Sequence, residues 1–283
     1  MAKTYLLGVA QEFASKRSIL DVQFVGKGGF KETFRLVDNS GNEFALKLID
    51  PIHSSSIRLD RELKLLAMFD CPLISKLHEF GAFVDSASET YIFIIEEFLG
   101  GGTLEDKLQS GLSKQKTIEL AISLMEALIY IKNRNIVHRD IKPANVLFRE
   151  KSDIPVLIDF GIARDLNNIS VTPTWQLRGP CSPYYASPEQ LNNDKNLIDW
   201  RTDQFSLGIV LSICFTGLHP FQEPGFTIDQ TIDKVVKRDK CSSTFIARMQ
   251  TLGLDAIPRM LEPWPHRRYQ DSKILLEIFQ KLR

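Results

Sequence analysis

The sequence predicts an α+β fold with two lobes: a small antiparallel-sheet lobe that carries one helix, and a larger lobe that is mainly helical. Residues 21–99 contain short runs of branched and aromatic side chains separated by turn signals, which is typical of strands. From Leu104 onward, apolar residues recur at the spacing of helices. Gly100, Gly101 and Gly102 stand between the two patterns, and such a run of glycines is typical of a break between elements.

The small lobe is expected at about residues 21–99, after an extension of residues 1–20 that has some helical pattern. Apolar residues at helical spacing predict its one helix over 57–69. The run Asn-Ser-Gly-Asn at 39–42 predicts a turn. Branched and aromatic runs predict four strands, at 21–25, 33–37, 43–48 and 91–98.

The larger lobe is expected over about 100–283. Ser113 is a suitable N-cap for a helix that runs to about Asn133 and has its apolar residues on one stripe. The most apolar stretch runs from Phe205 to Phe215 and is shorter than the roughly 18 residues that a membrane span needs. It predicts a buried helix in the core of this lobe.

The composition excludes several classes of protein. A chain of 283 residues, 43% of them hydrophobic, can build a core without disulfides or metal. Its 35 basic and 35 acidic residues give a net charge of zero, which argues against nucleic acid or an anionic membrane as the main partner. The four cysteines form no Cys-x-x-Cys pair, so a reduced, cytoplasmic location is expected. The oligomeric state stays open.

A glycine-containing run, Gly26-Lys27-Gly28-Gly29, lies between two predicted strands. Glycines let backbone N–H groups approach phosphate oxygens without a side-chain clash. Such a run is also common in simple hairpin turns, so it indicates phosphate binding only together with other motifs. The strand that follows it disfavours the P-loop and dinucleotide-binding motifs, which both need a helix there.

A lysine lies on the next predicted strand, in Ala45-Leu46-Lys47. A charged side chain among apolar residues needs a partner. A phosphate would serve, and so would the carboxylate of Glu62 in the middle of the predicted helix. A surface lysine on an edge strand and a solvated glutamate are the simpler alternative.

The segment from His138 to Asn145 carries the strongest chemical signal. Asp140 can accept the proton of an attacking hydroxyl, and Lys142 can place its ammonium near a transferring phosphoryl group. Asn145 supplies a neutral oxygen for Mg²⁺. Phosphoryl transfer depends mostly on positioning and charge stabilisation, so it needs these residue types.

A second acidic motif, Asp159-Phe160-Gly161, follows the apolar run 156–158. An aspartate at the end of a buried strand is well placed to hold a hard metal ion through oxygen. The three residues alone are common by chance, so their position after the loop at 138–145 gives them meaning.

Together and in this order, these motifs resemble the eukaryotic-type Ser/Thr protein kinase family, and the resemblance covers residues 21 to 283. It implies ATP and Mg²⁺ as cofactors, a protein Ser or Thr hydroxyl as substrate, and autophosphorylation. In the family, Lys47 would pair with Glu62 and the α- and β-phosphates, and Asp140 would be the catalytic base, with Lys142 beside it. Asn145 and Asp159 would hold the metal ions. ATP would be bound by Gly26, Lys27, Gly28, Gly29, Lys31, Ala45, Lys47, Glu97 and Leu99.

Further positions extend the resemblance. Residues 182–189 resemble the substrate-docking end of the activation segment, where Ser182 would hydrogen-bond Asp140 and Lys142. Asp203 would brace the backbone of the catalytic loop. Arg268 matches the family's late arginine, which pairs with Glu189.

Two positions depart from the family pattern. Lys31 replaces the third glycine of the phosphate loop, and it either points into solvent or adds charge near the phosphates. Glu96 falls at the gatekeeper position at the back of the adenine pocket, which is usually apolar or threonine. Substrate preference is not readable, since Thr103 lacks a carboxylate and the direction of Glu105 and Asp106 is unknown.

Regulation is expected through the activation loop. In the family, a phosphate on this loop is received by arginines such as Arg139 and Arg164. Thr172 or Thr174 is the expected autophosphorylation site.

Two other functions stay open at this point. A small-molecule kinase of the aminoglycoside or choline type shares the lobes but lacks the Lys142 pattern and the docking segment. A pseudokinase acting as a scaffold would normally have lost Lys47, Asp140, Asn145 or Asp159, and all four are present.

Overall fold

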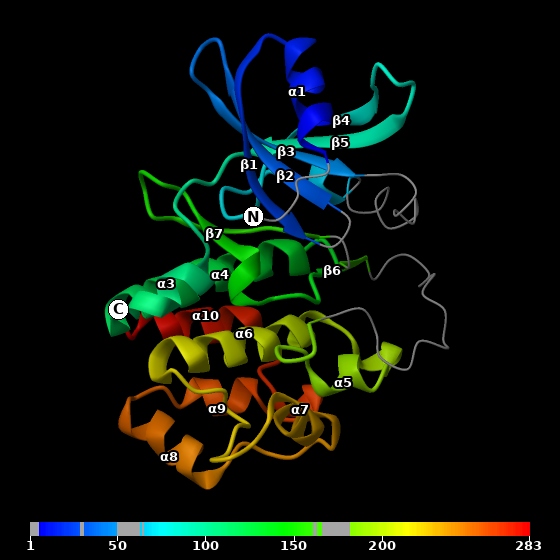
Figure 1. The fold of residues 1–283 in the computed structure, drawn as a ribbon. Coiled ribbons are helices and arrows are strands. Elements are labelled where there is room, and N and C mark those ends of the chain that lie inside the picture. Colours follow the sequence, from blue (N-terminus) through cyan, green and yellow to red (C-terminus); the bar gives the residue numbers. More distant parts are fainter. Residues whose placement is uncertain (1–5, 29–30, 50–62, 64, 161–162, 166–181) are drawn as a thin grey trace. The chain divides into compact units, whose positions relative to one another are not determined.

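The computed structural model describes residues 6–28, 31–49, 63, 65–160, 163–165 and 182–283. The chain divides into two compact units, Met1–Gly100 and Gly101–Arg283. The first unit contains a five-stranded antiparallel sheet and the second is mainly helical (Figure 1). The predicted α+β, bilobal fold class is therefore confirmed.

The sheet of the first unit has the strand order β1-β2-β3-β5-β4, and every neighbouring pair is antiparallel. Four of its strands were predicted from the sequence, with ends that differ by a few residues. The fifth, β4, was missed because it is an edge strand whose side chains are mostly exposed, so its sequence lacks a clear alternation. The strands are β1 (Ile19–Gly28), β2 (Lys31–Asp38), β3 (Glu43–Ile49), β4 (Leu77–Val84) and β5 (Thr90–Glu97).

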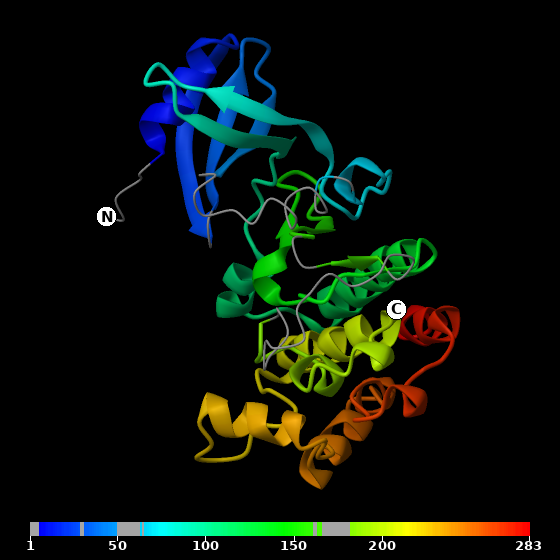
Figure 2. The same ribbon diagram turned by 90° about the vertical axis from the view of Figure 1, so that its right-hand side faces the viewer.

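One face of this sheet is covered by α1 (Leu7–Ser15), which lies against it in both views (Figures 1 and 2). Phe13 is fully buried, and its ring centroid lies 5.2 Å from that of Phe83 and 4.9 Å from that of Phe93. The guanidinium of Arg17 covers Phe13 and pairs with Glu79 of β4 at 2.7 Å. The helix thus completes the main apolar core of this unit.

A buried carboxylate, Glu32, ties the start of α1 to the glycine-containing hairpin. Its Oε2 accepts a hydrogen bond from the backbone N–H of Leu6 at 3.0 Å, and its Oε1 pairs with Lys27 at 3.1 Å. Glu32, Phe34 and Leu36 are every second residue of β2, so the side chain of Glu32 lies on the face that α1 covers.

The opposite face of the sheet carries a second apolar cluster of Ile49, Leu63 and Ile94. Leu63 and residues 65–67 are helical, as predicted for 57–69. Met68 is in a turn, Phe69 follows it without regular structure, and the other residues of the predicted range lie outside the described residues. Lys47 lies on this second face because it alternates with Leu46 and Leu48 of the first.

The second unit is built around α4 and α6, which pack against each other, with α10 against α4 and α9 against α6. Ser113 caps α4 as predicted, and its Oγ accepts from the backbone N–H of Lys116 at 3.2 Å. The predicted apolar stretch forms the buried part of α6. The helices are α3 (Leu104–Ser110), α4 (Lys114–Lys132), α5 (Pro188–Leu191), α6 (Trp200–Thr216), α7 (Ile228–Val236), α8 (Ser243–Thr251), α9 (Ala256–Met260) and α10 (Ser272–Gln280).

Two short strand pairs carry the loops of interest in this unit. One pairs β6 (Ile136–Val137) with β9 (Arg164–Asp165), and the other pairs β7 (Val146–Phe148) with β8 (Pro155–Leu157). Gly101 donates to the carbonyl of Phe148 at 2.9 Å, and a Cβ at Gly101 would lie 2.7 Å from that oxygen. A glycine is therefore required at this close approach. Among the described helices, none combines the length and the apolar character of a membrane span.

Candidate active site

The catalytic loop expected from the sequence connects β6 to β7 and is hydrogen-bonded to Asp203 of α6. The carboxylate of Asp203 accepts hydrogen bonds from the backbone N–H groups of His138 and Arg139, both at 2.8 Å. Arg139 has a φ of 73°, a left-handed conformation that a non-glycine residue adopts only when its surroundings impose it. Burial raises the pKa of Asp203 to about 7, against the effect of the two N–H groups. The predicted bracing contact is confirmed.

Asp140 is the centre of a hydrogen-bonded cluster. Its Oδ2 accepts from the ammonium of Lys142 at 2.8 Å and from the amide of Asn145 at 2.9 Å. Its Oδ1 accepts from the backbone N–H of Ser182 at 3.2 Å, and Lys142 also donates to Ser182 Oγ at 2.7 Å. The predicted contacts of Ser182 with Asp140 and Lys142 are thus present. The cluster fixes a carboxylate beside an ammonium, which suits it to accept a proton next to a developing negative charge.

His138 shapes the same loop from inside. Its Nε2 lies 3.0 Å from the carbonyl oxygen of Ile158, so Nε2 carries the proton, and Nδ1 accepts from the backbone N–H of Asp140 at 3.2 Å. Burial lowers the pKa of His138. The ring also packs edge-on against Phe160, with centroids 4.6 Å apart. A neutral histidine therefore links the catalytic loop to the Asp-Phe-Gly motif.

The two residues expected to hold metal come together through β7 and β8. Val146 pairs with Leu157, and the backbone N–H of Ile158 donates to the carbonyl of Asn145 at 3.0 Å. Asn145, just before β7, and Asp159, just after β8, therefore lie at the same end of the strand pair. The Asn145 amide nitrogen bonds both the backbone and the carboxylate of Asp140, which turns its side-chain oxygen away from them. An amide oxygen and a carboxylate are hard ligands that fit Mg²⁺. The described residues contain no cluster of three His, Cys, Asp or Glu that would suit another metal.

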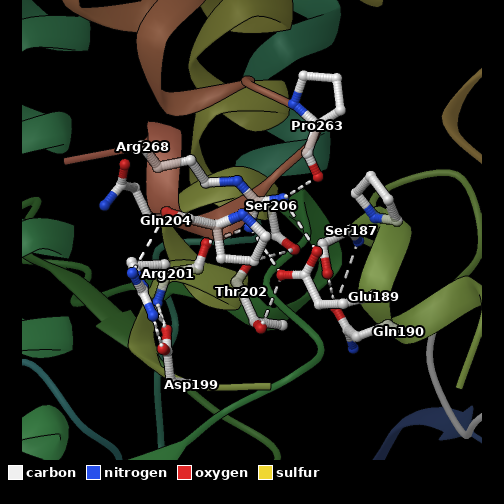
Figure 3. Close-up of polar contacts among 12 residues, drawn as sticks. Ser187, Glu189, Gln190, Asp199, Arg201, Thr202, Gln204, Ser206, Pro263 and Arg268 are labelled. Atoms are coloured by element: carbon white, nitrogen blue, oxygen red, sulfur yellow. Dashed lines mark hydrogen bonds and ion pairs between the residues drawn. The ribbon is translucent and has the colours of Figure 1, made fainter. Parts of the chain in front are cut away.

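Residues 182–189, which resemble the substrate-docking segment of the family, are anchored by a buried ion pair between Arg268 and Glu189 (Figure 3). Both side chains have 0% exposure, and the two N–O distances are 2.7 Å and 2.9 Å. The backbone carbonyls of Arg201, Glu262 and Pro263 accept the other three N–H groups of the guanidinium. This predicted pair is confirmed, and its complete hydrogen bonding offsets the cost of burying two charges.

Gln190, which the sequence analysis did not single out, links this anchor to the catalytic loop. Its amide donates to the carbonyl of Arg139 at 2.8 Å. A glutamine near a docking motif carries no signal of its own, and only the fold brings it to Arg139.

A hollow of about 330 Å³ opens beside Lys142 and Ser182, with Pro143, Tyr185 and Glu105 among its walls. Glu105 is exposed, and burial together with the nearby Glu105 charge raises the pKa of Tyr185 to about 12. The structure thus answers which way the two acidic residues of α3 face. Glu105 faces the hollow, whereas Asp106 forms a capping box with Thr103.

Three of the residues expected to bind nucleotide, Gly26, Ala45 and Lys47, share one face of the sheet of the first unit, whereas Lys27 and Glu97 belong to its opposite face. Gly26 pairs with Thr33, Thr33 with Lys47, and Lys47 with Ile94, so these positions form one row across four strands. Ala45 lies opposite Glu96 on the neighbouring strand. Lys27, Gly28 and Lys31 belong to the hairpin strands, Glu97 ends β5, and Leu99 follows it as a buried residue. Gly29 and Glu62 lie outside the described residues, so the expected pair of Lys47 with Glu62 stays a prediction.

Lys47 has a carboxylate partner that the sequence analysis did not assign to it. Its Nζ lies 2.9 Å and 3.0 Å from the two carboxylate oxygens of Glu96. The hydroxyl of Ser75 donates to Glu96 Oε2 at 2.8 Å. Glu96, which departs from the family pattern, is therefore ion-paired with Lys47, the lysine that the resemblance assigns to the α- and β-phosphates.

The regulatory expectation rests on residues that are only partly described. The backbone of Arg164 pairs with Val137, two residues before Arg139, so the two arginines belong to neighbouring segments. Thr172 and Thr174 lie outside the described residues, and their phosphorylation stays a prediction.

Comparison with known proteins gives the family. The model of the protein kinase domain matches residues 20–279. The chain belongs to this family. It is 34% identical over 207 residues to a probable serine/threonine-protein kinase of Streptomyces coelicolor, 70% of this chain and 30% of that protein.

Other kinases show a similar likeness. The identity is 32% over 225 residues to calcium-dependent protein kinase 5 of Plasmodium berghei, 77% of this chain and 37% of that protein. It is 30% over 269 residues to CBL-interacting protein kinase 1 of Oryza sativa, 91% of this chain and 55% of that protein. The chain thus spans between about a third and just over half of the length of these relatives.

Proposed function

We propose that the chain is an ATP-dependent protein kinase that phosphorylates Ser and Thr hydroxyls of proteins. The observation that carries the proposal is the Asp140 cluster, in which Lys142, Asn145 and Ser182 fix both oxygens of the carboxylate. Membership of the protein kinase family and the serine/threonine kinases among its relatives support it. Lys142 supports a Ser or Thr substrate, since the resemblance gives tyrosine kinases an arginine-bearing variant of this loop.

In the proposed reaction, Asp140 accepts the proton of the substrate hydroxyl as its oxygen attacks the γ-phosphorus of ATP. The new O–P bond forms while the bond between the γ-phosphorus and the β–γ bridging oxygen breaks, so that ADP leaves. Lys142 lies beside Asp140 and stabilises the negative charge of the transferring group. Ser182 holds both side chains in register for this step.

The resemblance assigns nucleotide binding to Lys47, the backbone of the glycine-containing hairpin, Glu97 and Leu99. Asn145 and Asp159 would hold Mg²⁺ through oxygen. When bound, this ion neutralises charge on the phosphates. These assignments are part of the proposal.

The proposal extends to the organisation and location of the protein. We assign residues 21–283 to the kinase domain and 1–20 to an extension. A cytoplasmic location fits Cys214 and Cys241, which are free thiols. Burial raises the pKa of each of these two thiols to about 12. The zero net charge fits a protein substrate rather than nucleic acid.

A catalytically weak scaffold is the alternative that a specific observation favours, because Lys47 is engaged by Glu96.

The test uses ATP radiolabelled at the γ-phosphate, Mg²⁺ and a generic protein substrate. We expect label on Ser or Thr with the wild type and none with Asp140→Asn. Asp153→Asn, which alters an exposed aspartate of the same unit, should leave labelling intact. Absence of label with the wild type favours the scaffold, and label on a small molecule only would indicate a small-molecule kinase.

A further inference from the structure

The carboxylate of Glu96 is buried in the middle of the first unit's sheet. The side chains of Glu96 and Lys47 are 3% and 12% exposed, and the Lys47 ammonium lies within 3.0 Å of both carboxylate oxygens. A charge at such a place is stable only with an opposite charge and well-formed hydrogen bonds. Glu96 has both.

The strand register makes this contact a property of the sheet. Lys47 on β3 lies directly opposite Ile94 on β5, and Glu96 is two residues further along β5 on the same face. Diagonal neighbours of this kind are about 7–8 Å apart at Cα, which a long lysine side chain bridges. The pairing of β3 with β5 therefore determines where the Lys47 ammonium lies.

Ser75 fixes the carboxylate from the other side. It lies two residues before Leu77, which pairs with Glu96 across β4 and β5. Its buried hydroxyl donates to Glu96 Oε2 at 2.8 Å. The chain of contacts from Ser75 to Glu96 to Lys47 leaves little freedom for the ammonium.

The glycine-containing hairpin contributes Gly26 to the same face of the sheet. Lys47 and Gly26 belong to one cross-strand row, separated only by Thr33. Two strand spacings of about 4.8 Å put the backbone of Gly26 roughly 10 Å from that of Lys47. A phosphate group under the hairpin is thus within reach of a lysine side chain held on this face.

We propose that Glu96, supported by Ser75, is a positioning residue for phosphoryl transfer that holds the Lys47 ammonium in place for the α- and β-phosphates of ATP. The resemblance gives this role to the helix carboxylate of Glu62, and the proposal gives it to a carboxylate of the sheet. The inference rests on the proposed kinase function, because it concerns the binding of ATP.

The test is a double-mutant cycle on the full chain, with ATP affinity and kcat as readouts. Glu96→Gln keeps the shape of the side chain and removes its charge. In the wild-type background it should weaken ATP binding roughly tenfold or more, the effect of a lost hydrogen bond to a charge. In the Lys47→Met background the same change should alter ATP affinity by less than about twofold, because Glu96 acts through Lys47. An equal loss in both backgrounds would mean that Glu96 only supports the fold, and would overturn the proposal.

Two further variants serve as comparisons for this double-mutant cycle. Glu79→Gln removes an ion-paired carboxylate from β4, which pairs with Arg17 beside α1, and should change neither readout. Glu62→Gln should reduce activity less than Glu96→Gln does, and the reverse order would contradict the proposal. Should Glu96→Gln not fold, Ser75→Ala replaces it, and a loss that disappears in the Lys47→Met background is expected.

Failure of the proposed function gives a different result. If the wild type neither binds ATP nor labels protein, the kinase proposal itself is wrong. If the wild type is active and Asp140→Asn is inactive, but Glu96→Gln behaves as the wild type, only the role of Glu96 is wrong.

Discussion

The ammonium of Lys47 lies 2.9 Å and 3.0 Å from the two carboxylate oxygens of Glu96, across neighbouring strands of one sheet. The resemblance to protein kinases expects this lysine to meet a carboxylate of a helix. Here a carboxylate at the gatekeeper position meets it, and strand pairing sets the geometry. Loss of the Lys47 ammonium would therefore leave the buried Glu96 carboxylate without its ion-pair partner.

Breaking this pair from the lysine side should destabilise the fold. Lys47→Met leaves the buried Glu96 carboxylate without its ammonium, and we expect a loss of about 3–5 kcal/mol in the free energy of unfolding, measured with urea. Adding Glu96→Met removes the buried charge and should recover most of the loss. A double variant that is no more stable than Lys47→Met alone would show that the pair does not carry this energy.

The packing of α1 makes a second prediction. Phe13 is fully buried between Phe83 and Phe93, so Phe13→Ala should lower the free energy of unfolding by about 3–5 kcal/mol. The control is Leu20→Ala, since Leu20 is 71% exposed and its loss should cost less than about 0.5 kcal/mol. Equal costs for the two changes would mean that α1 is not part of the core.

A third prediction concerns pH. Burial lowers the pKa of His219 to about 4, and its Nε2 lies 2.9 Å from the carbonyl oxygen of Tyr184. An unfolded histidine titrates near 6.5, so below that pH the unfolded chain binds a proton that the folded chain refuses. This contribution to stability is complete above about pH 6.5 and is lost as the pH falls toward 4.

The size of this pH effect is of order 3 kcal/mol, given about 1.4 kcal/mol for each unit of pKa difference. Urea unfolding between pH 7 and 4.5 measures it for the wild type and for His219→Gln. The stability difference between the two proteins should shrink or change sign as the pH falls. A difference that stays constant over this range would contradict the assignment.

The hollow beside Ser182 makes a prediction about substrates. Among the described residues that line the hollow, Glu105 is the one carboxylate, and the tyrosine and proline side chains suit an aliphatic stem. We therefore expect a preference for Arg or Lys near the phosphorylated residue. A peptide library phosphorylated by the wild type and by Glu105→Gln measures this preference. Glu105→Gln should weaken it, while Asp106→Asn, at the neighbouring capping position, should leave it in place. An unchanged peptide profile in Glu105→Gln would exclude Glu105 as the selecting residue.

Much of the fold could be predicted because local signals and final structure agree. Ser113 precedes an amphipathic run and caps α4, and the apolar run at 205–215 is the buried part of α6. The strand β4 could not be predicted in this way, because its residues are mostly exposed and Gly81 interrupts it. The place of α1 also depends on partners far along the chain, such as Phe83 and Phe93.

The candidate site likewise contains residues that the sequence could identify and residues that it could not. Asp140, Lys142 and Asn145 lie within six consecutive residues, so a contiguous motif could identify them. Ser75 and Gln190 act through residues 21 and 51 positions away, and nothing in their local sequence indicates this. Glu96 was noticed as a departure from the family, but its partner follows only from the register of β3 and β5.

The role of Asp140 is tested by comparing kcat and ATP affinity between the wild type and Asp140→Asn, with a Ser-containing peptide as substrate. The Asp140 cluster predicts that kcat falls by roughly 10²–10⁴-fold, since proton acceptance is lost, while ATP affinity changes by less than about threefold. A variant that keeps kcat within about tenfold of the wild type, or that loses activity only through weaker ATP binding, would contradict the role of Asp140 as the base in phosphoryl transfer.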